Sequence, residues 1–108
     1  YQVSVRYNTK HAPITKEQIK EKILNAKADL ANIGIVHLDL TGSLVNGTFG
    51  DYSDADVIVD FKDGFSIKKL KEAKSFIGKL LGLRADVISS TDRFAQTPDL
   101  IRFRERLF

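Results

Sequence analysis

Residues 42–56, G-S-L-V-N-G-T-F-G-D-Y-S-D-A-D, lie between two apolar runs and determine how the chain is interpreted. The first run, residues 35–40, ends just before Gly42-Ser43, and the second, residues 55–61, begins inside the pair of aspartates. Both runs are short, and the second is rich in β-branched residues, which predicts two strands. The glycines and polar residues between them predict a turn-rich connection with one or two helical turns. This connection therefore joins the end of one strand to the start of the next.

The segments on either side alternate between helical and strand patterns. Thr15 and Gln18 form a capping-box pattern that opens a helix, and Gly34 and Gly82 are stop signals for two helices. The expected elements, in chain order, are an edge strand (1–8), a helix (15–34), a strand (35–40), a short helix (44–49), a strand (55–61), a helix (67–81), a strand (84–89) and a final helix (98–107). We therefore expect one domain over residues 1–108 in the α/β (α+β) class, a small mixed sheet of three core strands plus an edge strand, packed with helices.

The composition limits the class of protein. The 108 residues suffice for one core, and the hydrophobic (43%) and charged (29%) fractions are those of a globular domain. The absence of cysteine excludes disulfides and thiolate metal sites, and no apolar run is long enough to cross a membrane, so we expect a cytoplasmic protein. A net charge of +3 without a dense basic stripe argues against direct nucleic-acid binding and suits a smaller anion, such as a nucleotide.

Two aspartates at the start of the second strand are candidate metal ligands. Asp54 and Asp56 are two residues apart, so their side chains project from one face of a strand, about 7 Å apart. Two carboxylates on one face repel each other unless a cation lies between them. Hard divalent ions such as Mg²⁺ are commonly held by one or two carboxylates together with substrate phosphates. Asp60 continues this face at the far end of the strand, where we expect it to be solvated.

Gly42 and Ser43 are candidate phosphate ligands. A glycine at the end of a strand permits close approach of a ligand to the backbone, and Ser43 is expected to cap the short helix that follows. The N–H groups at a helix start bind anions. Either motif alone is common in turns and strand entries. Together, at this separation and in a strand–turn–helix–strand order, they predict a phosphate site beside a metal site, as phosphoryl or nucleotidyl transfer requires.

The whole stretch, extended to G-S-L-V-N-G-T-F-G-D-Y-S-D-A-D-V-I-V, resembles the signature of the nucleotidyltransferase fold of the DNA polymerase beta superfamily. Together with the later L-G-L-R-A-D-V-I, it is most similar to the minimal nucleotidyltransferase (MNT) domains that act as antitoxins of HEPN-domain toxins. The resemblance covers residues 35–89 well and the final helix loosely, and it does not include residues 1–8. It implies that Gly42 and Ser43 bind the triphosphate, that Asp54 and Asp56 bind metal ions, and that Asp86 is the third catalytic acid and metal ligand.

The same resemblance implies a reaction and a partner. AMP from ATP would move to a hydroxyl acceptor, with two Mg²⁺ ions as cofactors and a tyrosine of a HEPN-type toxin as the acceptor. The chain has no residues left for the acceptor-binding domain of larger nucleotidyltransferases, so we expect a hetero-oligomer with the partner, or a homodimer. One alternative is a non-catalytic antitoxin that neutralises its partner by binding alone. Another is transfer of the nucleotide to a small molecule or an RNA.

The chain also departs from the family pattern at the phosphate end. Many members carry arginine at the two positions held here by Leu44 and Asn46, and an aromatic residue where this chain has Thr41. Arginine suits bidentate contact with phosphate, so its loss favours the non-catalytic alternative. Retention of all three acids favours catalysis.

Other polar residues have simpler explanations. His37 and Asp39 are expected to hydrogen bond within their strand rather than to bind a metal. The final helix is expected to expose its arginines to solvent, with Arg102 and Arg106 on one face and Arg104 on another. An alternative is that a partner or a nucleotide phosphate binds these arginines. An exposed lysine face is expected on the helix over 67–81, at Lys68, Lys69, Lys71, Lys74 and Lys79.

Overall fold

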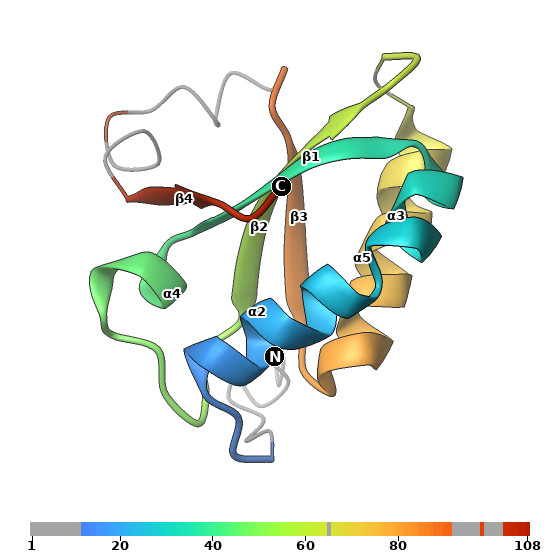
Figure 1. Cartoon of the computed structure of the whole chain (residues 1–108). Helices are drawn as coiled ribbons and strands as arrows, with labels where there is room; N and C mark the ends of the chain where they lie inside the picture. Colours follow the sequence, from blue (N-terminus) through green and yellow to red (C-terminus); the bar gives the residue numbers. More distant parts are fainter. Residues whose placement is uncertain (1–11, 65, 92–97, 99–102) are drawn as a thin grey trace, which may run out of the picture.

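The computed structural model describes residues 12–64, 66–91, 98 and 103–108, shown in Figure 1. Its elements are α2 (Lys16–Asn25), α3 (Lys27–Ile33), β1 (Ile35–Thr41), α4 (Ser43–Asn46), β2 (Ala55–Phe61), α5 (Ile67–Leu81), β3 (Ala85–Ser89) and β4 (Arg104–Arg106). In the described part of the chain the strands form one mixed sheet in the order β3-β2-β1-β4. The strand predicted over residues 1–8 lies outside the described residues.

The sheet combines antiparallel and parallel pairs. β1 is antiparallel to both β2 and β4, whereas β2 and β3 are parallel and are connected through α5. The predictions of strands over 35–40, 55–61 and 84–89 are confirmed, each to within one residue at either end. None of the helices in the described ranges has both the length and the apolar character needed to span a membrane.

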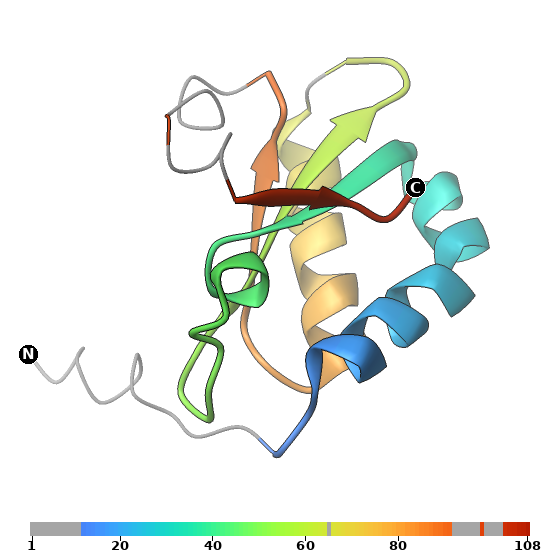
Figure 2. The same cartoon turned by 60° about the vertical axis from the view of Figure 1, so that its left-hand side comes forward.

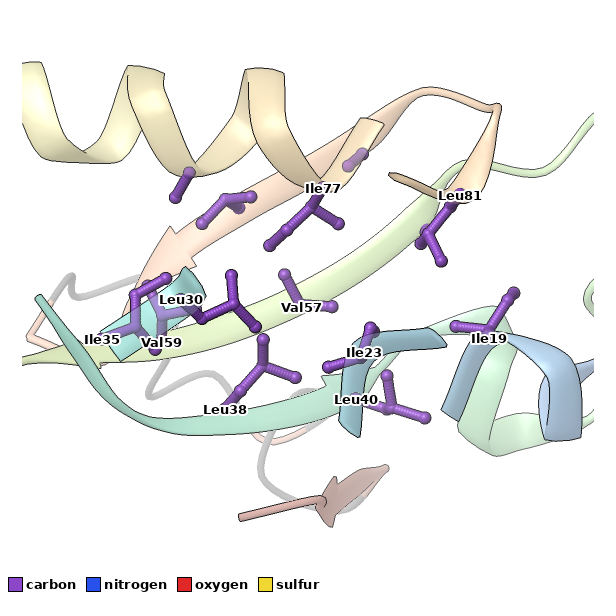
Figure 3. Packing of buried hydrophobic residues seen from close by; sticks show 14 of the residues in the cluster. Ile19, Ile23, Leu30, Ile35, Leu38, Leu40, Val57, Val59, Ile77 and Leu81 are labelled. Atoms are coloured by element: carbon purple, nitrogen blue, oxygen red, sulfur yellow. The ribbon is translucent and has the colours of Figure 1, made fainter. Parts of the chain in front are cut away.

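The hydrophobic core lies between the sheet and the longer helices. Figures 1 and 2 show α2, α3 and α5 gathered on one side of the sheet, with the short α4 apart from them at the end of β1. In Figure 3, Ile77 and Leu81 of α5 point toward the strands, where Val57 of β2 lies among the buried side chains. Burial of these apolar side chains is the main favourable term that holds the helices on the sheet.

α5 forms as its sequence predicts. The Ser66 hydroxyl accepts the Lys69 N–H at the helix start, and Gly82 ends the helix with a left-handed φ of 73°. Its buried residues Ala73, Ile77 and Leu81 recur every fourth position and face the sheet. The predicted lysine face is exposed, except that Lys69 is half-buried and lies 3.9 Å from Asp63.

The single helix predicted between residues 15 and 34 is wrong, because the chain breaks at Ala26 into α2 and α3. Ala26 has φ −98° and ψ 12°, which departs from helical geometry, and its N–H is shared between the carbonyls of Lys22 and Ile23. The break changes the direction of the chain, so that Ile23 of α2 and Leu30 of α3 both reach the core. The predicted capping box is confirmed: Thr15 accepts the Gln18 N–H, and the Gln18 side chain accepts the Thr15 N–H.

The predicted final helix is also wrong over its described C-terminal part, where residues 104–106 form β4. Its predicted start lies mostly outside the described residues. In β4, Glu105 points toward α2 and pairs with Lys16 at 2.8 Å and Lys20 at 2.9 Å. Arg104 and Arg106 point to the opposite face of the sheet and both contact Asp39. This alternation of side-chain direction is the mark of a strand and separates a helix-covered face from a polar face.

Candidate active site

Gly42 lies against the carboxylate of Asp56. Its φ of 65° and ψ of −137° belong to a region that residues with a side chain rarely adopt. A Cβ atom built at this position would lie 2.5 Å from Asp56 Oδ2, which is closer than atoms can approach without movement. The sequence therefore needs glycine here for two independent reasons, backbone conformation and space beside the acid.

The turn after Gly42 differs in one detail from the prediction. Gly42 itself is the N-cap residue of α4, and its carbonyl accepts the N–H groups of Val45 and Asn46, both at 3.0 Å. Ser43 is the first helical residue and makes no capping hydrogen bond, so the expectation that its hydroxyl caps this helix is wrong. The half-buried Ser43 side chain therefore has no structural role in the cap.

Asp56 and Asp86 face each other across neighbouring strands. They are register partners in the parallel pair of β2 and β3, so their side chains lie on the same face of the sheet. Asp54 immediately precedes β2 and lies two residues before Asp56. Asp86 is exposed, whereas Asp54 and Asp56 are partly buried. The fold thus brings an acid that is 30 positions away in the sequence beside the Asp-x-Asp pair.

Burial and the neighbouring acids of this cluster shift the pKa of Asp56. The pKa of its carboxyl is raised from 3.8 to about 6, mainly by burial and in addition by the negative charges of Asp86 and Asp54. The neutral form is therefore favoured until the pH approaches 6. A positive charge bound beside the three carboxylates would reverse this effect, because it favours the ionised form.

The donor set of this cluster fits a hard divalent cation that shares its coordination with substrate phosphates. All three side chains offer only oxygen, the ligand that Mg²⁺ prefers, and the charges of Asp86 and Asp54 both act on Asp56. Among the described residues, no three His, Cys, Asp or Glu side chains are gathered closely enough to hold a metal ion by themselves. An ion bound here would therefore need further oxygen ligands, which the phosphates of a nucleotide can supply.

The positions that depart from the family pattern have structural roles. Leu44 is 2% exposed and belongs to the hydrophobic core, where an arginine would bury its charge. The Asn46 side chain accepts hydrogen bonds from the N–H and the hydroxyl of Thr48, so it stabilises the turn. Thr41 is fully buried, and its hydroxyl donates to the carbonyl of Phe103 at 2.7 Å. Residues 42–56 contain no Lys or Arg, so this stretch supplies no cation to a phosphate.

His37 and Asp39 do not hydrogen bond each other, which corrects that prediction. His37 is exposed, and its Nδ1 lies 3.4 Å from the carbonyl of Phe108. Asp39 is 4% exposed and accepts the Nε–H groups of Arg104 at 2.8 Å and Arg106 at 2.9 Å. The expectation that these arginines are solvated on a helix is therefore wrong. Their pairing with Asp39 went unpredicted because no local pattern links residues 65 or more positions apart.

Asp60 lies at the far end of the same strand face as Asp56. Its carboxylate accepts a hydrogen bond from the Ser90 hydroxyl and is half-buried, so the expectation of a fully solvated side chain is wrong. Asp60 pairs in register with His37 rather than with another acid. It therefore stands apart from the cluster at Asp54, Asp56 and Asp86.

Comparison with known proteins identifies the family of this chain. Residues 16–107 match the family described as the nucleotidyltransferase domain. The protein adenylyltransferase MntA of Thermococcus cleftensis is 33% identical over 78 residues, which cover 71% of this chain and 79% of that protein.

Two solved structures share the fold. A chain of the crystal structure of a toxin–antitoxin with AMP-PNP has a TM-score of 0.69 at 19% identity, over 82% of this chain and 72% of that chain. The second is the structure of the tri-AMPylated Shewanella oneidensis HEPN toxin in complex with MNT antitoxin. One chain of that complex has a TM-score of 0.64 at 17% identity, over 87% of this chain and 72% of that chain. At such low identity the likeness establishes the fold alone.

Proposed function

The chain belongs to the nucleotidyltransferase domain family, and from that premise we propose that it transfers AMP from ATP to a tyrosine hydroxyl of a HEPN-type toxin partner. The transfer would depend on a divalent metal and would make the chain an antitoxin. The observation that carries the proposal is the approach of Gly42 to Asp56, with Asp86 in register on the next strand. This arrangement places one residue without a side chain, Gly42, beside a cluster of acids.

The relatives support the choice of nucleotide and acceptor. The archaeal protein that is one-third identical is named a protein adenylyltransferase. One of the structures with the same fold contains AMP-PNP, and another contains a HEPN toxin that carries AMP groups. These descriptions make a protein hydroxyl the first acceptor to test, ahead of a small molecule or an RNA.

In the proposed reaction the acceptor hydroxyl oxygen forms a bond to the α-phosphorus of ATP, while the bond from that phosphorus to pyrophosphate breaks. The hydroxyl proton passes to Asp86, whose exposed carboxylate then releases it to solvent. Asp56 acts as an anion, which its pKa of about 6 permits at neutral pH. Gly42 and Ser43 would bind the triphosphate, and the absence of a side chain at residue 42 leaves the space beside Asp56 open to it.

Asp54, Asp56 and Asp86 are the residues that would hold the metal. When bound, divalent ions such as Mg²⁺ neutralise phosphate charge and lower the pKa of an acceptor hydroxyl.

A specific observation favours the rival function, neutralisation by binding alone. Leu44 is buried in the core and Asn46 stabilises a turn, so neither position offers the cation that many relatives have there. A chain that had lost its affinity for ATP could keep the fold as a scaffold for toxin binding. AMP transfer requires the three aspartates, whereas neutralisation by binding alone does not.

The test combines this protein, Mg²⁺, labelled ATP and the candidate toxin. We expect label on the toxin, and its loss in Asp54→Asn and Asp56→Asn. Asp60→Asn is the matched control, because it removes the same charge from the same face of the same strand and its amide can still accept the Ser90 hydrogen bond. Absence of label with the wild-type protein, together with stoichiometric inhibition of the toxin, would reject catalysis and establish the binding function.

A further inference from the structure

Two arginines converge on one buried carboxylate on the polar face of the sheet. Arg104 and Arg106 of β4 donate their Nε–H groups to different oxygens of Asp39 on β1. One arginine would suffice to neutralise this aspartate, so the group keeps one net positive charge. Asp39 is almost fully buried, whereas the side chains of Arg104 and Arg106 are 23% and 56% exposed. The excess charge therefore lies on groups that a ligand in solvent can reach.

The strand register places Arg104 in line with the acids. Thr41 is the register partner of Asp56 on one side and of Arg104 on the other, and Asp56 is in turn the partner of Asp86. Residues directly opposite each other in a sheet point to the same face. The row across the sheet therefore reads Asp86, Asp56, Thr41, Arg104, with two strand spacings, about 10 Å, between the Cα atoms of Asp56 and Arg104.

Gly42 directly follows Thr41, which lies between Asp56 and Arg104 in this row. The hydroxyl of Thr41 donates to the carbonyl of Phe103, which fixes the start of β4 beside the end of β1. Figure 2 shows β4 lying along β1 on the side of the sheet that carries α4. A polyphosphate bound at Gly42 would thus have the acids on one side and the guanidinium of Arg104 on the other.

We propose that Arg104 binds the phosphates of the nucleotide and supplies the cation that residues 42–56 lack. This inference rests on the proposed function, since it names a further ligand for the same ATP. A guanidinium carries five N–H donors, and the contact of Arg104 with Asp39 uses the Nε–H, so the side chain retains donors for a phosphate. Asp39 orients the guanidinium, and Arg106 shares the same carboxylate two register positions further from Gly42.

The pairing with Asp39 also supplies a matched control. Arg104→Gln and Arg106→Gln each remove one Nε–H donor to Asp39, at nearly equal distances, but only Arg104 lies in the row of Asp56. We expect titration calorimetry with ATP and Mg²⁺ to show roughly tenfold or greater weakening of ATP binding in Arg104→Gln. Arg106→Gln should bind within about twofold of wild type, and adenosine should bind both variants alike, because it has no phosphate.

Unchanged ATP affinity in Arg104→Gln, or equal losses in both variants, would overturn the inference and leave the two arginines as structural partners of Asp39. A wild-type protein that binds ATP but transfers no AMP would remove only the catalytic step, and the affinities of the two variants would still decide the role of Arg104. A wild-type protein that binds no ATP would reject the proposed function and this inference together.

A measurement on the wild-type protein covers the outcome that Arg104→Gln fails to fold. In nitrogen-15 spectra of the arginine side chains, titration with ATP and Mg²⁺ should shift the Nε–Hε signal of Arg104 more than that of Arg106. Equal or absent shifts at saturating ATP would overturn the inference without any substitution.

Discussion

Replacement of Asp56 by asparagine should make the protein more stable while it abolishes transfer. The pKa of Asp56 is raised from 3.8 to about 6, so the folded protein holds an unfavourable charge at neutral pH. One pKa unit corresponds to about 1.4 kcal/mol, which sets an upper bound of about 3 kcal/mol. Because Asp56 is only partly buried, solvent screening reduces the expected gain in the free energy of unfolding to about 1–2 kcal/mol.

The gain should depend on pH in a defined window. A carboxyl whose pKa is higher in the folded state stabilises the fold below its unfolded pKa, and this contribution is lost as the pH rises to the folded value. The difference between Asp56→Asn and wild type should therefore be small near pH 4, grow up to about pH 6 and remain constant above it. Differences between the two proteins cancel the titration of groups that are common to both.

Urea unfolding at pH 4, 5, 6 and 8, without metal, measures this difference. Asp63→Asn is the control, because Asp63 is 76% exposed and its loss should change stability by less than about 0.5 kcal/mol. Addition of Mg²⁺ and ATP should stabilise the wild type more than Asp56→Asn, since a ligand that binds only the folded state raises its stability. A variant that is less stable than wild type at pH 8, or a difference that is the same at all four pH values, would refute the reasoning.

Three further predictions follow from the same site and its surroundings. Gly42→Ala should destabilise the fold by about 1–3 kcal/mol in urea unfolding and abolish AMP transfer, because its Cβ would meet Asp56 and its φ is positive. Gly47→Ala, also at positive φ but in open space, should cost about 1 kcal/mol and leave transfer intact; equal activity of the two variants would contradict the close-approach argument. Asp39→Asn should lower the free energy of unfolding by about 2 kcal/mol, because it leaves two arginines without their carboxylate, and an unchanged urea midpoint would contradict this. In a pH–rate profile, kcat/KM for transfer should fall as the pH falls below about 6, where Asp56 becomes protonated, and a flat profile from pH 5 to 8 would show that its ionisation is not required.

The sequence alone predicts the helices and strands whose signals lie within the segment itself. The helix over 67–81 has a cap, an apolar stripe and a terminal glycine, and the structure reproduces its bounds. The strands at 35–41 and 55–61 are short, mainly apolar runs, and they lie in the middle of the sheet. Local signals agree with the global fold in these segments, which is why periodicity alone finds them.

The failures occur where distant contacts decide the structure. In residues 102–108, R-F-R-E-R-L-F, Phe103 and Leu107 are four positions apart, a spacing that fits one face of a helix as well as one face of a strand. The three residues of β4 are extended because they pair with β1, more than 60 positions earlier in the chain. The break at Ala26 is similar, since it allows α2 and α3 to follow the surface of the sheet. No signal within either segment distinguishes these outcomes.

The candidate site also has a part that a local pattern predicts and a part that depends on distant contacts. Gly42, Ser43, Asp54 and Asp56 lie within 15 residues, so their pattern is visible in the sequence. The place of Asp86 beside Asp56 requires the parallel pairing of β2 and β3, and only the resemblance to a family pointed to it. The sequence raised a phosphate only as an alternative partner for the C-terminal arginines. It did not predict the position of Arg104, which depends on the antiparallel pairing of β4 with β1.

The topology of the sheet explains why a cation on β4 can serve a site built on β1 and β2. An antiparallel neighbour starts where its partner ends, so the first residue of β4, Arg104, lies beside the last residue of β1, Thr41. The turn that follows β1 contains Leu44, whose burial in the core excludes a charge at that position. A helix over residues 98–107 would have turned Arg102 and Arg106 to one face and Arg104 to another. The strand instead turns Arg104 to the face that carries Asp56, so that acids and arginine lie on opposite sides of Gly42.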